Sequence, residues 1–479
     1  MSLVQDTSPA QVDETVAAAD RAAPGWAARS RAERAASLRA VADELDRAAD
    51  DLVPIAIRET HLGEPRLRGE LSRTTFQLRL LAEVLEEGAY LHARVDHADP
   101  AWPMGPRPDL RRTGIPYGPV VVFAASNFPF AFSVAGGDTA SALAAGCPVI
   151  VKAHPGHPAL SDATAEVVTA ALPEGVFGLV HGDAAGVAVL THPKVRAAAF
   201  TGSIRGGRAL FDMAAARPEP IPFYGELGSV NPVFVTAAAD AARGETVAEG
   251  LVGSFTLGAG QFCTKPGLVL APRGSRLVAA LAGGALPPAA PLLNDRITDA
   301  YLHGRQRLRD HPDVRVVAEG PDPLSPSVFA TTVTALLADR EVLQEECFGP
   351  TVLVAEYDEE SQLLEVAGTV AGQLTASLVA DEDDPLAGEL TAVLATKAGR
   401  LLWNQWPTGV SVTHAQQHGG PYPATTAVGT TSVGTAAIDR FTRPVAYQGF
   451  PQTLLPAELR EDPASSRVPR TVDGKQEQP

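Results

Sequence analysis

Two patterns of apolar and polar residues follow one another along the chain. Residues 10–95 are rich in Ala, Leu, Arg and Glu, with apolar residues three and four positions apart, which predicts amphipathic helices. From about residue 112, short β-branched runs alternate with stretches of small residues. Strands buried on both faces of a parallel sheet are continuously apolar, so four runs predict strands: GPVVVFAAS, CPVIVKA, GVFGLVHG and RAAAFTGS. Their alternation with helices indicates a doubly wound parallel sheet.

A second alternating region extends from about residue 230 to 435, with VNPVFVT, GLVLAP and TVLVAEY as predicted strands. The chain is therefore expected to have the α/β fold class, with two sheet-containing units. Residues 455–479 have few large apolar side chains after Leu459, so we expect the last ten residues to be poorly ordered.

Composition and charge narrow the possible partners of this 479-residue chain. Lys and Arg number 39 against 56 Asp and Glu, a net charge of −17, which argues against nucleic acid and anionic membrane surfaces. The three cysteines do not form a disulfide framework, and the N-terminus lacks the pattern of a signal peptide. We therefore expect a soluble cytoplasmic protein. We assign no residue to a metal.

The best candidate for a reactive thiol is Cys263, in the sequence GAGQFCTKPG, because flanking glycines let the backbone approach a ligand closely. Cys147 instead opens an apolar strand, and Cys347 follows two glutamates that oppose thiolate formation. Taken alone, Cys263 is also compatible with simple packing.

Two polar residues could assist such a nucleophile. Glu226, between glycines in PFYGELGSVNP, is placed as a general base, although a helix cap or a surface ion pair explains it equally well. Asn127 ends a predicted strand and could donate to an oxyanion, although asparagine is also common in turns before proline.

Several residues could bind a dinucleotide. Lys152 ends a predicted strand, where ligands bind in open α/β sheets. Gly202 and Gly207, in FTGSIRGGRAL, lie between a strand and a helix whose N-terminal amides could face a pyrophosphate. Glu346 could accept from ribose hydroxyls and Phe348 could pack beside them, although a turn acid and a core aromatic fit as well.

The order of these features is more specific than any one of them. Six separated motifs resemble those of the aldehyde dehydrogenase superfamily in sequence and spacing, including 37 residues from Glu226 to Cys263 (263 − 226). The six are N127-F-P, V151-K152, F200-T-G-S, E226-L-G, G260-Q-F-C263 and E346-C-F-G-P.

The resemblance implies NAD(P)-dependent oxidation of an aldehyde to a carboxylate. Cys263 would attack the aldehyde, Asn127 and the Cys263 backbone N–H would bind the oxyanion, and Glu226 would activate the water that hydrolyses the thioester. For the cofactor it implies Lys152 at the adenosine ribose, Gly202 and Ser203 at the pyrophosphate, and Glu346 at the nicotinamide ribose.

Longer segments resemble α-ketoglutarate semialdehyde dehydrogenases, and a related branch oxidises fatty aldehydes with NADP. We therefore expect a short oxo-acid semialdehyde as substrate. The alternatives are a medium- or long-chain aldehyde and a catalytically silent protein on the same scaffold, which usually lacks the nucleophile or the base.

Two departures from the family pattern bear on specificity. Pro155 stands where many NAD-preferring members have a glutamate that repels a 2′-phosphate, so NADP should be accepted and is favoured over NAD. Ala135 replaces the arginine of succinate-semialdehyde enzymes, so a carboxylate clamp must come from elsewhere. The candidate substrate-binding residues are Phe128, Lys265, Trp406, His414 and His418.

The resemblance also implies a domain division and an assembly. A Rossmann-type cofactor domain would comprise residues 1–99 and 117–229, and a catalytic domain residues 230–437. Residues 100–116 and 438–479 would form a small bridging element and tail, which pairs subunits into a homodimer or homotetramer.

Overall fold

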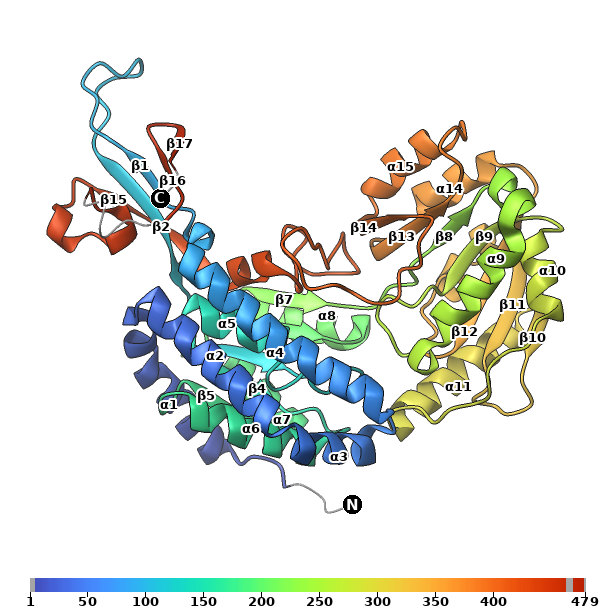
Figure 1. Ribbon diagram of the computed structural model, residues 1–479, viewed down its shortest axis with the longest axis horizontal. Coiled ribbons are helices and arrows are strands. Elements are labelled where there is room, and N and C mark those ends of the chain that lie inside the picture. The colour runs from blue at the N-terminus through green and yellow to red at the C-terminus, as the bar shows by residue number, and fades with distance from the viewer. Residues whose placement is uncertain (1–4, 462–467, 478–479) are drawn as a thin grey trace.

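The computed structural model describes residues 5–461 and 468–477, and its three β-sheets mark three parts of the molecule (Figure 1). A five-stranded sheet lies in the centre with the N-terminal helices packed around it. A seven-stranded sheet lies on the right in this view, and a second five-stranded sheet projects at the upper left.

Four helices form the N-terminal region, as the apolar periodicity of residues 10–95 predicts. Ser8 and Ser30 begin the first two helices with capping boxes, in which the serine hydroxyl accepts from the backbone N–H three residues later. The buried faces of these helices join the core of the central sheet. The helices are α1 (Pro9–Ala28), α2 (Arg31–Arg47), α3 (Ala49–Thr60) and α4 (Glu64–Glu87).

The central sheet is parallel, with the strand order β5-β4-β3-β6-β7. The strand order changes direction between β3 and β6, and the carboxyl ends of strands at such a point form a ligand-binding crevice. The strands are β3 (Val120–Phe123), β4 (Val149–Lys152), β5 (Phe177–Val180), β6 (Ala197–Thr201) and β7 (Phe223–Glu226). The helices between them are α5 (Gly137–Ala145), α6 (Pro158–Ala171), α7 (Asp183–Thr191) and α8 (Ile204–Ala215).

The seven-stranded sheet has the order β10-β11-β12-β9-β8-β13-β14, parallel except for β10. Its strands are β8 (Val233–Val235), β9 (Leu268–Pro272), β10 (Arg315–Glu319), β11 (Ser327–Thr332), β12 (Thr351–Tyr357), β13 (Gln373–Val379) and β14 (Ala398–Trp403). Its helices are α9 (Ala237–Thr256), α10 (Arg276–Gly283), α11 (Asp295–Asp310), α12 (Val333–Ala338), α13 (Arg340–Leu343), α14 (Ser361–Thr369) and α15 (Ala387–Ala395). Together the two sheets confirm the predicted α/β fold class. No helix in the described ranges is long and apolar enough to cross a membrane.

The third sheet joins segments that are far apart in the chain. Its order is β15-β2-β1-β16-β17, from β1 (Arg94–Asp96), β2 (Leu110–Pro116), β15 (Thr442–Gln448), β16 (Arg470–Val472) and β17 (Lys475–Glu477). The expectation of a poorly ordered C-terminus is therefore wrong for residues 470–477, because β16 pairs in parallel with β1. Residues 478–479 lie outside the described part.

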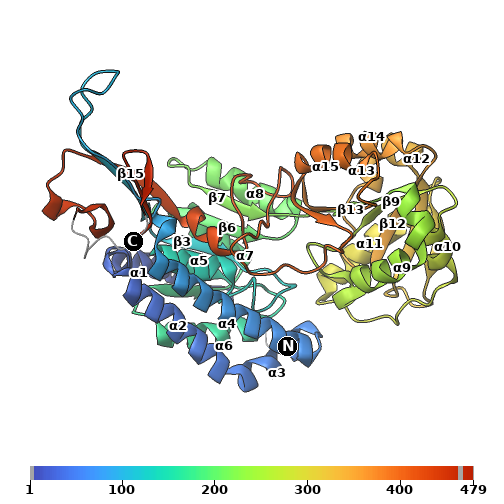
Figure 2. The same ribbon diagram turned by 45° about the horizontal axis from the view of Figure 1, so that its top comes forward.

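The course of the chain also differs from the expected domain division. After Trp403 the chain leaves the seven-stranded sheet and runs back along the central one (Figure 2). There Leu227 N–H donates to the Ala424 carbonyl at 2.8 Å, and Thr426 N–H donates to Gly225 at 3.0 Å. Part of the segment expected in the catalytic domain up to residue 437 thus packs on the central sheet. Strand β1, expected in the cofactor domain, similarly belongs to the third sheet. Neither difference could be predicted, because such long-range pairings leave no local sequence signal.

Candidate active site

Cys263 follows a tight turn at the end of α9. Residues 258–260 all have left-handed backbone, with φ of 57°, 54° and 69°. A Cβ on Gly260 would lie 2.2 Å from the carbonyl oxygen of Gly349, so glycine is required there. Beyond the turn, the Asn231 amide donates to the Cys263 carbonyl at 2.8 Å. The backbone that carries the thiol is thereby held on both sides.

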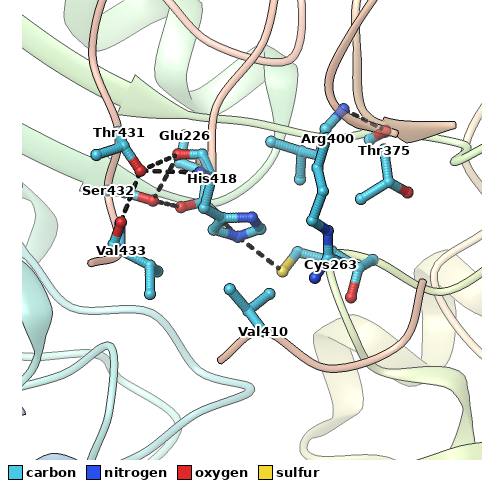
Figure 3. Close-up of polar contacts among 12 residues, drawn as sticks. Glu226, Cys263, Thr375, Arg400, Val410, His418, Thr431, Ser432 and Val433 are labelled. Carbon is cyan, nitrogen blue, oxygen red and sulfur yellow. Dashed lines mark hydrogen bonds and ion pairs between the residues drawn. The ribbon is translucent and has the colours of Figure 1, made fainter. Parts of the chain in front are cut away.

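The thiol lies beside a buried histidine and a buried carboxylate (Figure 3). His418 Nε2 is 3.5 Å from Cys263 Sγ and 2.8 Å from Glu226 Oε1. The Ser432 hydroxyl donates to the other carboxylate oxygen of Glu226. One imidazole nitrogen, Nε2, therefore lies beside both the nucleophile and the carboxylate and positions them near each other.

The electrostatics of this group keep the thiol protonated and the carboxylate ionised. Burial raises the pKa of Cys263 well above its usual value, and the negative charges of Glu226 and Glu346 raise it further. Burial also acts to raise the pKa of Glu226, but His418 and the Ser432 hydroxyl together outweigh it, so this pKa is lowered. A neutral thiol thus faces an anionic acceptor across the imidazole.

Asn127 follows β3 and is buried near the same point. Its Nδ2 donates to the carbonyl oxygen of Gln261, two residues before the nucleophile, at 3.1 Å. A carboxamide has two N–H donors, so one remains for a ligand. The backbone carbonyl of Asn127 is fixed by the Arg66 guanidinium at 2.8 Å. This arrangement suits an oxyanion donor.

A cavity of about 240 Å³ opens at the thiol. Three phenylalanines form much of its wall, and Phe128 packs edge-on against Phe262 with ring centroids 5.1 Å apart. The complete lining is Arg66, Gly69, Glu70, Arg73, Phe128, Phe132, Phe262, Cys263, Thr264, Gly409 and Val410.

Two of the predicted cofactor-binding segments lie at the carboxyl ends of strands in the central sheet. Lys152 ends β4, and its Nζ contacts Asp183 Oδ1 at 2.7 Å. Ser203 follows β6 and caps α8, where its hydroxyl accepts from the Gly206 N–H at 3.2 Å. Such a helix N-terminus presents backbone donors to an anion.

The glycines beside this cap allow close packing. A Cβ on Gly207 would lie 2.1 Å from Leu227 Cδ2, and one on Gly202 would lie 2.6 Å from the Phe200 ring. The backbone can therefore pack closely against Leu227 and Phe200 here only because side chains are absent at these two positions. The residues present fit a dinucleotide at this edge of the sheet.

Glu346 and Lys265 lie on the other side of the nucleophile. A Cβ on Gly228 would be 2.4 Å from Glu346 Oε2, and burial raises the pKa of Glu346 to about 7. Lys265 is buried, and its Nζ donates to the carbonyls of Cys347 at 2.9 Å and Thr351 at 2.8 Å. Lys265 thus ties the turn of Glu346 to the nucleophile loop and does not face the thiol cavity. Half-buried Phe348 belongs to the same turn.

Of the remaining candidates for substrate binding, some lie at the cavity or the thiol and others lie elsewhere. Phe128 lines the cavity and His418 adjoins the thiol, whereas His414 is exposed. Trp406 packs on the core beside α9, where a Cβ on Gly250 would meet its Nε1 at 2.1 Å. Neither His414 nor Trp406 lines the cavity, so we do not retain them as substrate residues.

Three residues at the site, Ser432, Arg66 and Arg73, were not identified as candidates from the sequence. Ser432 adjoins Glu226 only because the returning segment crosses the central sheet, so no local signal marks it. Arg66 and Arg73 could have been identified from the sequence, because they are seven positions apart and therefore share one face of a predicted helix.

Curated relatives are similar over nearly the full chain. The "Alpha-ketoglutaric semialdehyde dehydrogenase 2" of Azospirillum brasilense is 47% identical, covering 98% of this chain and 92% of the relative. The "Alpha-ketoglutaric semialdehyde dehydrogenase" of Acinetobacter baylyi is 44% identical, covering 97% and 91%.

Solved structures share the fold at lower identity. Lactaldehyde dehydrogenase from Escherichia coli superposes with a TM-score of 0.78 at 21% identity, covering 92% of each chain. A mutant aldehyde dehydrogenase from Pseudomonas syringae, complexed with NAD⁺ and octanal, has a TM-score of 0.78 at 22% identity, covering 94% and 91%. The profile of the aldehyde dehydrogenase family matches residues 1–283 and 308–445. The protein therefore belongs to the aldehyde dehydrogenase family.

Proposed function

We propose that this enzyme oxidises α-ketoglutarate semialdehyde to α-ketoglutarate with NADP or NAD. The observation that carries the chemistry is the buried contact of Cys263, His418 and Glu226, whose reacting atoms all lie within 4.8 Å of one another. The substrate is supported by the relatives at 47% and 44% identity, whose names state that activity.

The first step is attack of the Cys263 sulfur on the aldehyde carbon. Because the thiol pKa is raised, a base must take its proton as the carbon–sulfur bond forms. The ionised Glu226 is the base, because its reacting oxygen and the Cys263 sulfur lie within 4.8 Å of each other. His418 Nε2, 3.5 Å from the sulfur and 2.8 Å from Glu226 Oε1, lies beside both groups and positions them for this transfer.

The oxyanion of the resulting hemithioacetal is bound by the free N–H of Asn127 and the backbone N–H of Cys263. When bound, the NAD(P) cofactor supplies the acceptor for the hydride that leaves the former aldehyde carbon. Loss of that hydride leaves a thioester on Cys263.

Hydrolysis of the thioester returns the enzyme to its starting state. Glu226 first releases to solvent the proton that it took from the thiol. It then takes a proton from water, the hydroxide adds to the thioester carbon, and the departing sulfur recovers that proton from Glu226, which restores the thiol and the carboxylate. One carboxylate oxygen of Glu226 accepts from the Ser432 hydroxyl and the other lies 2.8 Å from His418 Nε2, so the base is positioned before water arrives.

The cofactor would be held by Lys152 at the adenosine ribose, by Gly202, Ser203 and the start of α8 at the pyrophosphate, and by Glu346 at the nicotinamide ribose. Gly207 permits the close packing that this needs. Pro155 places no carboxylate near a 2′-phosphate, which supports the use of NADP. Subunit pairing through the third sheet, to a homodimer or homotetramer, is part of the same proposal.

The test is steady-state oxidation of α-ketoglutarate semialdehyde, hexanal and dodecanal, followed by reduction of NADP or NAD. We expect a kcat/KM at least about tenfold higher for the semialdehyde than for either aliphatic aldehyde. Cys263→Ala should abolish turnover while NADP still binds in calorimetry. A preference for dodecanal would replace the substrate by a fatty aldehyde, and turnover by Cys263→Ala would refute the nucleophile.

A further inference from the structure

The walls of the thiol cavity are apolar, yet helix α4 places two guanidinium groups in them. Arg66 and Arg73 are two helical turns apart and are both half-buried. Glu70 lies between them on the same face, with its Oε1 held by the backbone N–H groups of Phe130 at 2.8 Å and Ala131 at 3.0 Å. Even with Glu70 ionised, two cations face one anion, so the lining is net positive.

The two guanidinium groups differ in how strongly contacts within the protein hold them. Arg66 donates to the Asn127 carbonyl at 2.8 Å and lies over the rings of Phe128 and Phe262, 5.2 and 4.7 Å from their centroids. It therefore supports the aromatic wall and the loop of the oxyanion donor.

Arg73 makes weaker contacts within the protein than Arg66 does. It lies 5.4 Å from the Phe132 centroid, and among the described residues it donates one hydrogen bond, to the Val410 carbonyl, which is long at 3.5 Å. An arginine carries five N–H donors, so most of those on Arg73 remain for a ligand. Among the described residues, neither Arg66 nor Arg73 forms an ion pair.

An unpaired cation among aromatic rings is costly, and an anionic ligand would remove that cost. Burial lowers the pKa of Arg73, while Glu70 and the more distant Cys263 and Glu226 act in the opposite direction. An aliphatic aldehyde would leave the guanidinium unpaired, whereas a carboxylate can accept two parallel N–H bonds from it.

We propose that Arg73 binds the carboxylate of an oxo-acid aldehyde whose carbonyl is at Cys263, and that it thereby selects charged over uncharged aldehydes. The proposal rests on the proposed function, because it assumes that Cys263 attacks an aldehyde in this cavity. It replaces Lys265, whose ammonium is bound to two backbone carbonyls on the other side of the loop.

The test compares 5-oxopentanoate with its methyl ester, which has the same aldehyde but no charge. The wild-type enzyme should prefer the acid by about tenfold or more in kcat/KM. In Arg73→Met this preference should fall by roughly 10- to 100-fold, mainly through KM for the acid, as expected for a lost charged hydrogen bond. Arg73→Lys, which keeps the charge but not the planar fork, should restore part of the preference.

Controls separate this role from a structural one. Arg68→Met alters an exposed arginine of the same helix, which pairs with Glu64 and Asp50, and should keep the wild-type preference. Binding of α-ketoglutarate, measured by calorimetry, should weaken in Arg73→Met by the same factor as KM, which gives a readout independent of turnover.

Two results would overturn the proposal while leaving aldehyde oxidation intact. One is equal wild-type turnover of acid and ester; the other is an Arg73→Met enzyme whose kcat/KM falls equally for both. If the wild-type enzyme oxidised neither compound, nor any other aldehyde, the proposed function itself would fail.

Discussion

The thiol of Cys263 is an unusual nucleophile, because its surroundings oppose its ionisation. Burial and two neighbouring carboxyl groups raise its pKa, so little thiolate exists at neutral pH. A base in contact is therefore needed for each turnover, and the raised pKa also makes the reactivity of the free enzyme depend steeply on pH.

Inactivation of the free enzyme by iodoacetamide should report this pKa. Since the thiolate reacts, the rate should keep rising as pH increases beyond 9, the usual pKa of a thiol. Glu226→Gln removes a negative charge that raises this pKa, so the midpoint should move to lower pH even though oxidation slows. The exposed Glu341→Gln is the control, and a wild-type profile that levels off below pH 8 would contradict the assignment.

His418→Gln tests the positioning role of the imidazole. A glutamine lacks the ring nitrogen that lies beside both the sulfur and the carboxylate, so kcat should fall about 10- to 100-fold. NADP binding should persist, because the ring lies at the thiol rather than beside Lys152. His303→Gln, an exposed histidine on α11, provides the matched control. A His418→Gln enzyme with wild-type kcat would show that Glu226 acts without the imidazole.

Among the secondary-structure elements, the junctions between strands and helices of the central sheet position the site. Asn127 follows β3, Lys152 ends β4, Ser203 follows β6 and Glu226 ends β7. Parallel strands bring their carboxyl ends to one edge, so four residues spread over 100 positions meet there. The strands β3, β4 and β6 were predicted from the sequence, whereas β7 was not, so the place of Glu226 beside the other three residues depended on the tertiary structure.

Gly207→Ala tests how tightly α8 packs at this edge. The added Cβ would lie 2.1 Å from Leu227 Cδ2, so the helix must shift, at a cost of about 1–3 kcal/mol in the free energy of unfolding. The shift moves the N-terminal amides of α8, and KM for NADP should rise. Gly253→Ala, whose Cβ meets nothing within 4 Å, should leave both quantities near wild type. Equal effects of the two substitutions would argue against the close packing.

Lys152→Met tests the cation at the end of β4. Loss of a charged hydrogen bond to the cofactor should raise KM for NADP about tenfold or more, with a much smaller change for the aldehyde. Lys194→Met removes a half-buried lysine that pairs with Asp20 at 2.8 Å, and should leave both KM values unchanged. A Lys152→Met enzyme in which both KM values rose together would contradict a cofactor role.

For the molecule as a whole, the segment after β14 matters most, because it completes the site. It carries His418 and Ser432 across the central sheet to Glu226. Beyond them, the 3₁₀ helix η3 (Thr435–Phe441) contacts α5, and Arg440 pairs with Asp138 at 2.7 Å with both side chains buried. This ion pair anchors the segment to α5, beside the central sheet.

Arg440→Met should loosen that anchor. Breaking one side of a buried pair leaves the carboxyl of Asp138 without its partner, at a cost of roughly 3–5 kcal/mol in the free energy of unfolding. We expect a lower thermal midpoint and a lower kcat, since His418 and Ser432 lose their support. Arg443→Met, an exposed position on β15, is the control. An unchanged midpoint in Arg440→Met would show that the segment is held by other contacts.

The sequence alone was sufficient to predict the helices of residues 10–95 and the alternating α/β pattern. Its six spaced motifs were sufficient to predict the family. Short-range periodicity and turn residues express the physics of single elements directly. Three features depended on tertiary contacts: the pairing of β16 with β1, the return of the chain across the central sheet, and the direction of Lys265 away from the cavity. Each joins groups distant in sequence, so which partner a side chain or strand edge finds is decided only when the chain packs.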